Sequence, residues 1–283
     1  MKFIEVVNQN QHMQGFTSDA EHKYMFWSFT DSVVKTNMNG TVICQVHCHD
    51  YGHLGGMDWH DGKVYVSFMA DPSPWTFWGD WSAYYIYVYD DYDLRLLDRI
   101  EIKECKEYKK DLTGGFFGID GIAFGKSPST GETRMFVAGA TVSGEEYAHE
   151  MIFEMSPGFD RIEKIHYIPN KNTVYGIQNL DYEADTGCFW ITTYGKSQPY
   201  QAEETLYRIS PSLDRVEAKY KFSTPYGFEC LGNGEYYCSL QSGTNGHREG
   251  IAYKCTSELF SSEMSEKESN AFIRDLIAKE KNV

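Results

Sequence analysis

The stretch Gly118-Ile-Asp-Gly-Ile-Ala123, followed by the apolar run at residues 135–138, shows the pattern on which this chain is built. A glycine-rich polar stretch leads into one short strand, and a turn leads into a second strand rich in apolar residues. Self-similarity of this kind at a period of tens of residues is the sequence sign of a repeat architecture. The same design opens at His12-Met-Gln-Gly-Phe-Thr17, His53-Leu-Gly-Gly-Met-Asp58, Gly176-Ile-Gln-Asn-Leu-Asp181 and Gly227-Phe-Glu-Cys-Leu-Gly232.

Each unit continues with two further strands on either side of a polar turn, as at residues 84–89 and 94–102. Turn residues such as Asn39-Gly40 between alternating apolar runs predict hairpins. Each unit is therefore predicted to be a four-stranded antiparallel meander, which is the blade of a β-propeller. The sequence predicts an all-β, five-bladed β-propeller over residues 1–260.

The two ends of the propeller sequence complement each other. The fifth unit has no clear fourth strand after residues 251–255, and the strand-like residues 2–7 have no hairpin partner of their own. We expect residues 2–7 to be the outer strand of the last blade, because that pairing closes the ring and leaves no unpaired strand at the seam.

The tail at residues 261–283 has a different pattern. Ala271, Phe272 and Leu276 recur at helical spacing among charged residues, which predicts an amphipathic helix appended to the propeller. Two interpretations stay open for this C-terminal helix: it docks on the outer sheet, or it binds a protein partner.

The net charge and the cysteine content limit which binding partners and which cellular compartment are expected. The chain has 26 Lys and Arg against 41 Asp and Glu, a formal charge of −15, so it repels phosphate backbones and anionic lipid. We therefore expect no nucleic-acid partner and no membrane partner. Glu5 and Asn8 interrupt the apolar start that a signal peptide needs. The seven cysteines include no Cys-x-x-Cys pair, so reduced thiols and a cytoplasmic location are expected.

One face of the predicted propeller is expected to contain the functional residues. The innermost strands begin on the face that also holds the loops between the second and third strands of each blade. These loops are long, at residues 69–83, 139–149, 194–204 and 241–249, and long loops on one rim of a rigid scaffold commonly form binding sites. We call this side the near face.

A column of polar residues is predicted at the mouth of the central channel on the near face. Asp120 and Glu229 would be an acid–base pair, or would hold a divalent cation such as Ca²⁺. Gln14 and Gln178 would position a ligand. In the alternative interpretation these side chains only bind ordered water in the channel. The residues aligned at this position of the five innermost strands are Gln14, Gly55, Asp120, Gln178 and Glu229.

Further candidates surround this column. His12 and His53, two residues before it in the first two blades, would carry protons near neutral pH. His247 and Arg248 could bind a carboxylate or phosphate, or Arg248 could pair with Glu249.

The loop at residues 69–83 is rich in tryptophan. Its rings would form an aromatic platform for a sugar, or would pack on one another as a lid. The three candidates are Trp75, Trp78 and Trp81.

Three segments resemble known propeller families. At Gln14-Gly-Phe-Thr17 and Gln178-Asn-Leu-Asp-Tyr182 the chain resembles five-bladed propellers of the glutamine cyclotransferase type. At His53-Leu-Gly-Gly56 it is similar to uncharacterised bacterial propellers. The cyclotransferase family has Asn-Glu-Leu-Glu where this chain has Gln178-Asn-Leu-Asp181, so Asn179 stands in place of an acid.

The leading hypothesis is a site for a small polar ligand, such as a saccharide, at the mouth of the channel, with hydrolase or lyase activity left open. The alternatives are a propeller that serves as a protein-interaction scaffold and a glutamine cyclotransferase-like enzyme. Serine-hydrolase and nucleotide-hydrolase motifs are absent from the sequence.

Overall fold

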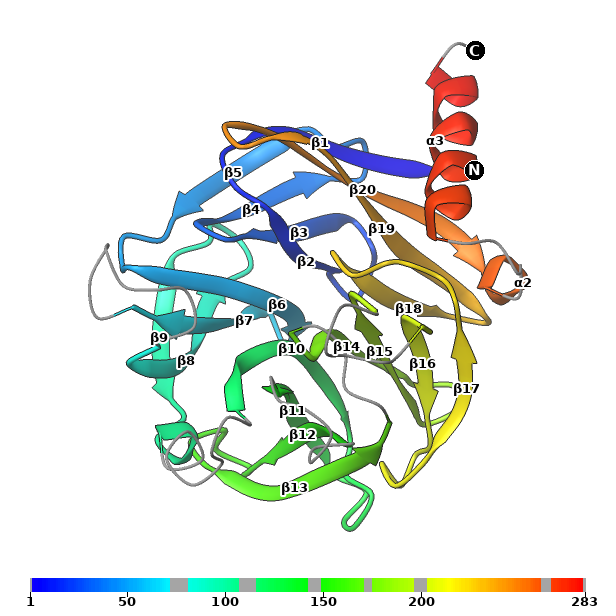
Figure 1. Cartoon of the computed structure of the whole chain (residues 1–283). Helices are drawn as coiled ribbons and strands as arrows, with labels where there is room; N and C mark the ends of the chain where they lie inside the picture. Colours follow the sequence, from blue (N-terminus) through cyan, green and yellow to red (C-terminus); the bar gives the residue numbers. More distant parts are fainter. Residues whose placement is uncertain are drawn as a thin grey trace.

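The computed structural model arranges five four-stranded antiparallel sheets around one axis, which makes the protein a five-bladed β-propeller, as the repeat predicts (Figure 1). It describes residues 2–71, 81–106, 116–141, 149–170, 175–195, 203–260 and 266–281. No helix within these ranges is long and apolar enough to span a membrane.

The first four blades each follow the chain from the innermost strand outward. Blade 1 contains β2 (Met13–Ser18), β3 (Tyr24–Phe29), β4 (Ser32–Asn37) and β5 (Val42–His47). Blade 2 contains β6 (Gly52–His60), β7 (Lys63–Ala70), β8 (Ala83–Asp90) and β9 (Leu96–Glu101). Blade 3 contains β10 (Phe116–Lys126), β11 (Thr133–Thr141), β12 (His149–Met155) and β13 (Ile162–Pro169). Blade 4 contains β14 (Ile177–Glu183), β15 (Cys188–Thr193), β16 (Leu206–Ile209) and β17 (Val216–Tyr220).

Blade 5 joins the two ends of the propeller. Its strands from the axis outward are β18 (Phe228–Gly232), β19 (Glu235–Thr244), β20 (His247–Thr256) and β1 (Phe3–Gln9). The antiparallel register pairs Ile4 with Ala252 and Glu5 with Ile251. The predicted closure of the ring by the N-terminal strand is confirmed.

Two of the hairpins between first and second strands are tight, because their turn residues accept positive φ. Asp61 and Gly62 join β6 to β7 with φ of 49° and 74°, and Asn233 and Gly234 join β18 to β19 with φ of 53° and 71°. Two successive residues in this region form the turn that matches the twist of paired strands.

The hydrophobic core lies between blades. Phe136 and Ile152 of blade 3 pack with Ile191 and Tyr207 of blade 4, and all four are fully buried. Burial of this surface holds neighbouring blades together, since a single meander has no other partner for its apolar face.

Near the axis the innermost strands approach one another through glycines. A β-carbon at Gly56 would lie 2.7 Å from Gly121 Cα, and one at Gly121 would lie 2.4 Å from Leu180 N. Only residues without a side chain allow this backbone contact between β6, β10 and β14. The axis is therefore narrow at this level.

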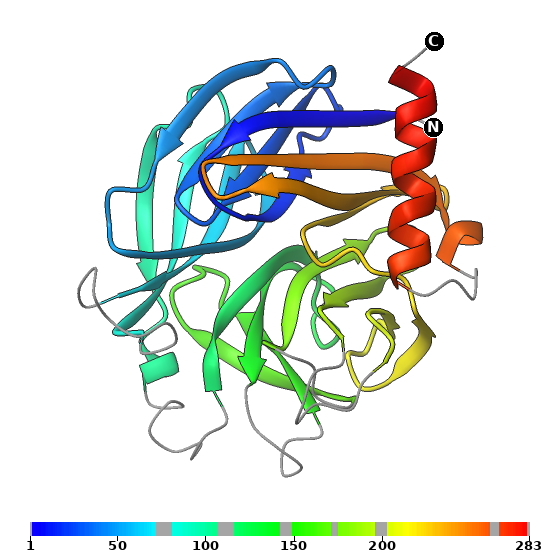
Figure 2. The same ribbon diagram turned by 45° about the horizontal axis from the view of Figure 1, so that its top comes forward.

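Two helices follow the last strand of the propeller: α2 (Ser257–Phe260) and α3 (Glu266–Lys281). Figure 2 shows α3 beside blade 5, next to β1 and β20. Ile273 and Ile277 of α3 are buried in the same cluster as Tyr253, and Lys281 Nζ lies 2.6 Å from Glu5 Oε2. The helix is amphipathic, but Phe272, expected on its apolar face, is 43% exposed.

Candidate functional site

Four of the five innermost strands, β2, β6, β10 and β14, share a local irregularity close to the near face. Their pairing with the second strand shifts register at the same position in each blade, as a bulge does, and a bulge redirects the local side chains. The residues at this position are Gln14, Gly55, Asp120 and Gln178. These four residues therefore form one level around the axis, which we call the mouth level.

Asp120 is the carboxyl group of the mouth level. Its side chain is buried, and its Oδ1 accepts a hydrogen bond from Gly56 N at 2.8 Å. Burial raises the pKa of Asp120 well above its usual value, because the ionised form loses its hydration. A carboxyl in this state keeps its proton at higher pH and can donate it to a bound oxygen.

The two amides of the mouth level have different partners. Gln14 Nε2 donates to Thr30 Oγ1 at 3.0 Å, and Gln178 Nε2 donates to Tyr175 O at 3.4 Å. Both side chains are buried, so their carbonyl oxygens are presented in a protected environment.

His53 lies beside the mouth level and is only 7% exposed. Burial, and to a smaller extent the nearby His12, lower the pKa of His53 to about 4, so its imidazole is neutral at neutral pH. Its ring centre lies 6.1 Å from that of Trp81. Trp81 is itself 2% exposed and belongs to the core, so the prediction that it offers an exposed aromatic platform is wrong. Trp75 and Trp78 lie outside the described residues.

His12 is held between two side chains of blade 5. Gln241 accepts a hydrogen bond from Met13 N at 2.7 Å through Oε1, which places its Nε2 2.9 Å from His12 Nδ1. Arg248 Nη2 lies 2.9 Å from His12 Nε2. Burial and the guanidinium of Arg248 lower the pKa of His12, since a second positive charge there is repelled.

The two rim residues predicted to bind an anion, His247 and Arg248, lie on the β19–β20 hairpin of blade 5. Arg248 also donates to Gly243 O at 3.0 Å and Asn245 Oδ1 at 2.9 Å, while His247 is exposed at the end of the β19–β20 hairpin. The expected alternative, a pair between Arg248 and Glu249, is replaced by a hydrogen bond from Ser242 Oγ to Glu249 Oε2 at 2.7 Å.

Three tyrosines near the mouth level were missed by the sequence analysis. The ring centre of Tyr194 lies 6.0 Å from that of Tyr175 and 5.9 Å from that of Tyr226. Burial, the two tyrosines and the negative charge of Asp120 raise the pKa of Tyr194. Tyr226 lies two residues before β18, and its N donates to Ser239 Oγ at 3.1 Å. The only sequence signal was an aromatic residue next to the end of a strand.

Glu229 does not belong to the mouth level. The register pairs Glu229 with Tyr237 of β19, just as it pairs Asp58 with Tyr65 of β7 and Asp181 with Trp190 of β15. Glu229 is thus equivalent to Asp58 and Asp181, three residues beyond the mouth level along the innermost strand. The alignment on the glycines misplaced it because Gly227 has a different role.

The reason for that different role is packing. A β-carbon at Gly227 would lie 2.4 Å from Phe16 Cδ1, so this glycine makes room for a ring of blade 1. By count along the sequence, the residue of blade 5 that corresponds to Asp120 of blade 3 is Tyr226, one residue before Gly227 and outside the paired residues of β18.

The three deeper carboxyls, Asp58, Asp181 and Glu229, connect neighbouring blades. Asp58 Oδ2 accepts a hydrogen bond from Phe124 N at 2.7 Å, and Glu229 Oε1 accepts one from Ser18 N at 2.8 Å. Asp181 Oδ2 accepts one from Cys230 N. Each bond satisfies a backbone donor on the innermost edge of another blade, which would otherwise be unpaired.

These deeper carboxyls also resist ionisation. Burial raises the pKa of Asp58 to about 7 and that of Glu229 to about 7, and burial with the charge of Asp58 raises that of Asp181. Within the described ranges, no three His, Cys, Asp or Glu side chains converge as a metal site requires. Because Asp120 and Glu229 lie at different levels, the expected cation shared by this pair does not fit the register.

Comparison with known proteins finds similarity in fold alone. No family model matches the chain, and no curated protein matches it. Among solved structures, the Bacteroides ovatus protein Xyloglucan PUL GH43B is similar with a TM-score of 0.55 and 8% identity, over 91% of this chain and 56% of that chain. A xylan beta-1,4-xylosidase from Bacillus halodurans C-125 is similar with a TM-score of 0.52 and 11% identity, over 90% of this chain and 56% of that chain.

This chain therefore spans about half the length of those two proteins. At such identities the similarity shows a shared propeller fold and nothing finer, because one fold hosts many chemistries.

Proposed function

We propose that the mouth level binds a small polar molecule of the saccharide class and that Asp120 is the residue that exchanges a proton with it. The observation that carries this proposal is the placement of Asp120, Gln14 and Gln178 at one bulge position around the axis. A few convergent polar groups in a protected site are what fixes the orientation of a hydroxylated ligand.

The chemistry of the mouth level is asymmetric. Asp120 is the acid, and neutral His53 is suited to accept a proton or a hydroxyl hydrogen bond. Glycoside hydrolysis normally uses two carboxyl groups that flank one bond. At the bulge position, Asp120 is the single carboxyl in the four blades that share the bulge. Binding, or proton exchange between Asp120 and the bound molecule, is therefore favoured over hydrolysis by a pair of carboxyls.

A thermal-shift screen tests the proposal. The probes are xylose, xylobiose, glucose, gluconolactone and CaCl₂, with the xylose sugars included because of the names of the two similar structures. The proteins are the wild type, Asp120→Asn, and Asp98→Asn as a matched control on the exposed surface of β9. We expect a sugar to raise the unfolding temperature of the wild type and the control only. A shift in all three proteins, or in none, contradicts the proposal.

One residue argues against the alternative of glutamine cyclotransferase-like activity. Asn179, which stands where that family has an acid, is 5% exposed and donates through Nδ2 to Pro225 O at 2.7 Å. This contact joins blade 4 to the chain that leads into blade 5. An assay with a glutaminyl peptide would still reveal such activity, as cyclised product from the wild type.

A further inference from the structure

The outer strand of blade 1, β5, is unprotected in a way that the other outer strands are not. Strands β1, β9, β13 and β17 each contain at least one Asp, Glu, Lys or Arg, whereas β5 reads Val-Ile-Cys-Gln-Val-His and contains none. Charged residues are the usual device that stops a free edge from pairing with another strand. The sheet order pairs β5 with β4 alone, so its second edge has no strand partner among the described elements.

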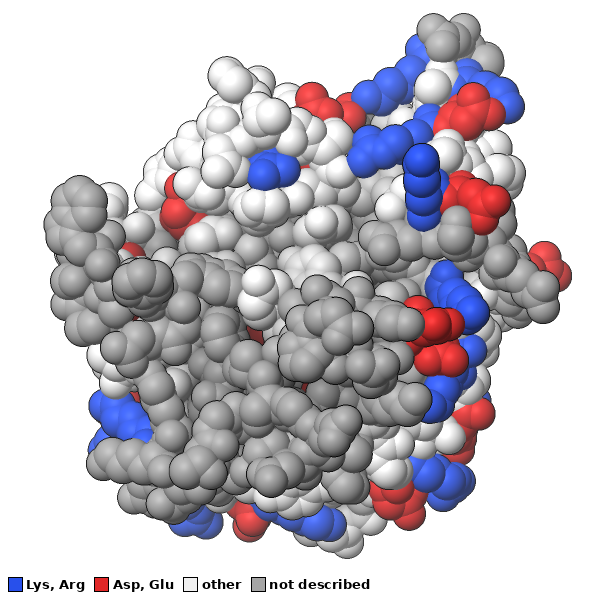
Figure 3. Space-filling model, viewed as in Figure 1, with Lys and Arg blue, Asp and Glu red and all other residues white. Residues whose placement is uncertain are grey.

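The surface around β5 is also apolar. Val42 is 45% exposed and Ile43 is 49% exposed. Figure 3 shows few charged side chains over blade 1 at the upper left, while blue and red alternate along the rim of blades 3 and 4 at the lower right. In a chain with a charge of −15 this is a local exception.

Two cavities lie along the seam between β5 and blade 2. The first, of about 440 Å³, has residues 45–50 on one wall and Leu94–Leu96 with Arg99 on the other. The second, of about 370 Å³, continues along the same walls with Ile43 and Cys44 facing residues 91–93. The two cavities adjoin along the chain, at Cys44 and Gln45 on one wall and at Asp93 and Leu94 on the other, and we call the pair the seam groove.

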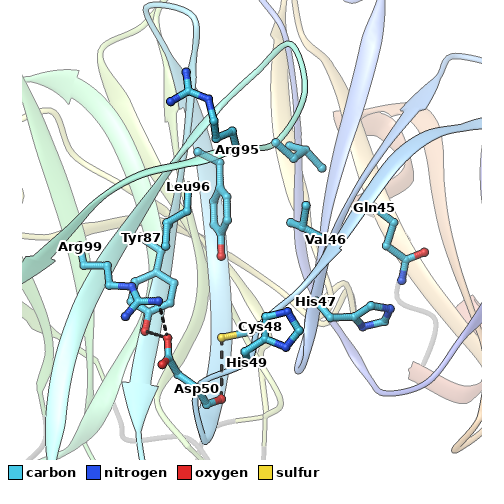
Figure 4. Close-up of a pocket in the computed structure, with 12 residues that line it drawn as sticks. Gln45, Val46, His47, Cys48, His49, Asp50, Tyr87, Arg95, Leu96 and Arg99 are labelled. Carbon is cyan, nitrogen blue, oxygen red and sulfur yellow. Dashed lines mark hydrogen bonds and ion pairs between the residues drawn. The ribbon is translucent and has the colours of Figure 1, made fainter.

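The seam groove has a basic end. Figure 4 shows Arg99 on the blade 2 wall beside Asp50 and across from His47 and His49, whereas Arg95 lies farther along that wall, beyond Leu96. Arg95 Nη2 lies 3.7 Å from Asp90 Oδ2. Arg99 is fixed over the ring of Tyr87, with its guanidinium carbon 5.1 Å from the ring centre, and its Nη2 lies 2.9 Å from Asp50 Oδ2. Asp50 is the single acid among the residues that line this end.

The opposite end is acidic. It is lined by Asp19, Asp91 and Asp93, against the one cation Lys35. Lys35 is 5% exposed, its Nζ donates to Asp91 O at 2.6 Å, and the same Nζ lies 4.1 Å from the centre of the Tyr24 ring. Its charge is therefore already shared with groups of this chain, which leaves the three carboxylates dominant.

We propose that the seam groove binds an extended peptide of a partner protein, which pairs with the free edge of β5. Every second side chain of an added strand would face the groove, as strand geometry dictates. Charge complementarity sets the sequence of the peptide: an acidic side chain at the Arg99 end, apolar side chains beside Val46 and Leu96, and a basic side chain at the Asp91–Asp93 end. This surface is separate from the mouth level, so the inference does not depend on the proposed saccharide site.

A displayed library of random peptides about twelve residues long tests the proposal when selected on the full-length protein. The strongest peptide is then synthesised, and its affinity is measured by fluorescence anisotropy. We expect peptides with the stated charge order, and we expect Ile43→Lys to weaken binding about tenfold or more, because it places a charge on the edge. Arg99→Gln should weaken acidic peptides selectively.

The matched control is Tyr167→Lys, which adds the same charge to the outer strand β13, at a residue that is 55% exposed. It should leave binding unchanged. Thermal unfolding of each variant verifies the fold. The proposal is overturned if no peptide is enriched, or if enriched peptides bind Ile43→Lys as well as the wild type. It is also overturned if light scattering shows a wild-type dimer that Ile43→Lys converts to monomer, because the occupant is then a second copy of the chain.

Discussion

Asp120 of blade 3 occupies the space that Gly55 of blade 2 leaves open. A β-carbon at Gly55 would lie 2.4 Å from Asp120 Oδ1 and 2.4 Å from Ser67 Oγ. The missing side chain in one blade thus allows the carboxyl of the next blade to reach the backbone N of Gly56. The two residues form one feature of the mouth level, although they are far apart in the sequence.

Gly55→Ala should therefore displace the carboxyl of Asp120. We expect a loss of about 1–3 kcal/mol in the free energy of unfolding, from overpacking, together with the loss of any sugar-induced thermal shift. Urea unfolding and the thermal-shift screen measure the two effects. Gly158→Ala is the control, since the nearest atom to its β-carbon would be 3.5 Å away. Unchanged stability in Gly55→Ala would show that the contact is easily relieved.

The deeper carboxyls predict how stability changes with pH. The folded-state pKa of Glu229 is about 7, above its usual value of 4.5, so folding favours the protonated form. This group contributes stability below about pH 4.5, and the contribution is lost as the pH rises through 7. Glu229→Gln keeps an oxygen acceptor for Ser18 N and cannot ionise.

Relative to the wild type, Glu229→Gln should gain on the order of 1–3 kcal/mol in unfolding free energy between pH 5 and pH 8. The free energies of unfolding of both proteins are measured with urea at pH 5 and at pH 8. His53, whose pKa is lowered, stabilises the fold as the pH rises, and this effect cancels when the wild-type value is subtracted from that of the variant. Glu258→Gln, at an exposed residue of α2, should show no pH-dependent difference. A constant difference for Glu229→Gln across this range would mean that Glu229 is ionised throughout.

The contact between Arg248 and His12 predicts a titration. Because the guanidinium lowers the pKa of His12, Arg248→Gln should raise that pKa toward the usual 6.5. The imidazole proton signals of His12 in an NMR titration report the change. Arg215→Gln, in an exposed ion pair of blade 4, is the control. No movement of the His12 signals would exclude a direct interaction.

The docking of α3 predicts a stability effect at one face of the helix. Ile273 is 1% exposed and Phe272 is 43% exposed. Ile273→Ala should lower the free energy of unfolding by about 2–4 kcal/mol, as removal of buried methyl groups does, while Phe272→Ala should have little effect. Chemical denaturation distinguishes them. Equal effects would mean that the helix does not use this face.

Much of the fold could be predicted because its determinants are local. Turn residues such as Asp61-Gly62 and Asn233-Gly234 mark hairpins, and five similar units require a ring. The unpaired N-terminal strand then had a single place left. The face of α3 could not be derived from spacing, because the outer surface of blade 5 decides whether Phe272 or Ile273 is buried.

The candidate site was predictable only in part. Gln14, Asp120 and Gln178 follow from the repeat because four blades, theirs included, keep the same bulge. Glu229 was misplaced because Gly227 makes room for the ring of Phe16. The sequence does not show which contact requires a glycine. Tyr194 contacts Tyr226, and Trp81 packs in one cluster with Ile119 of blade 3. These are contacts between blades, which no spacing along one strand encodes.

The most direct test of the central claim is calorimetric titration of the best sugar from the screen into the wild type, Asp120→Asn and Asp98→Asn. Binding at the mouth level predicts one sugar per chain for the wild type and Asp98→Asn, with affinity lost in Asp120→Asn. Equal affinity for all three proteins would place the sugar elsewhere and contradict the account.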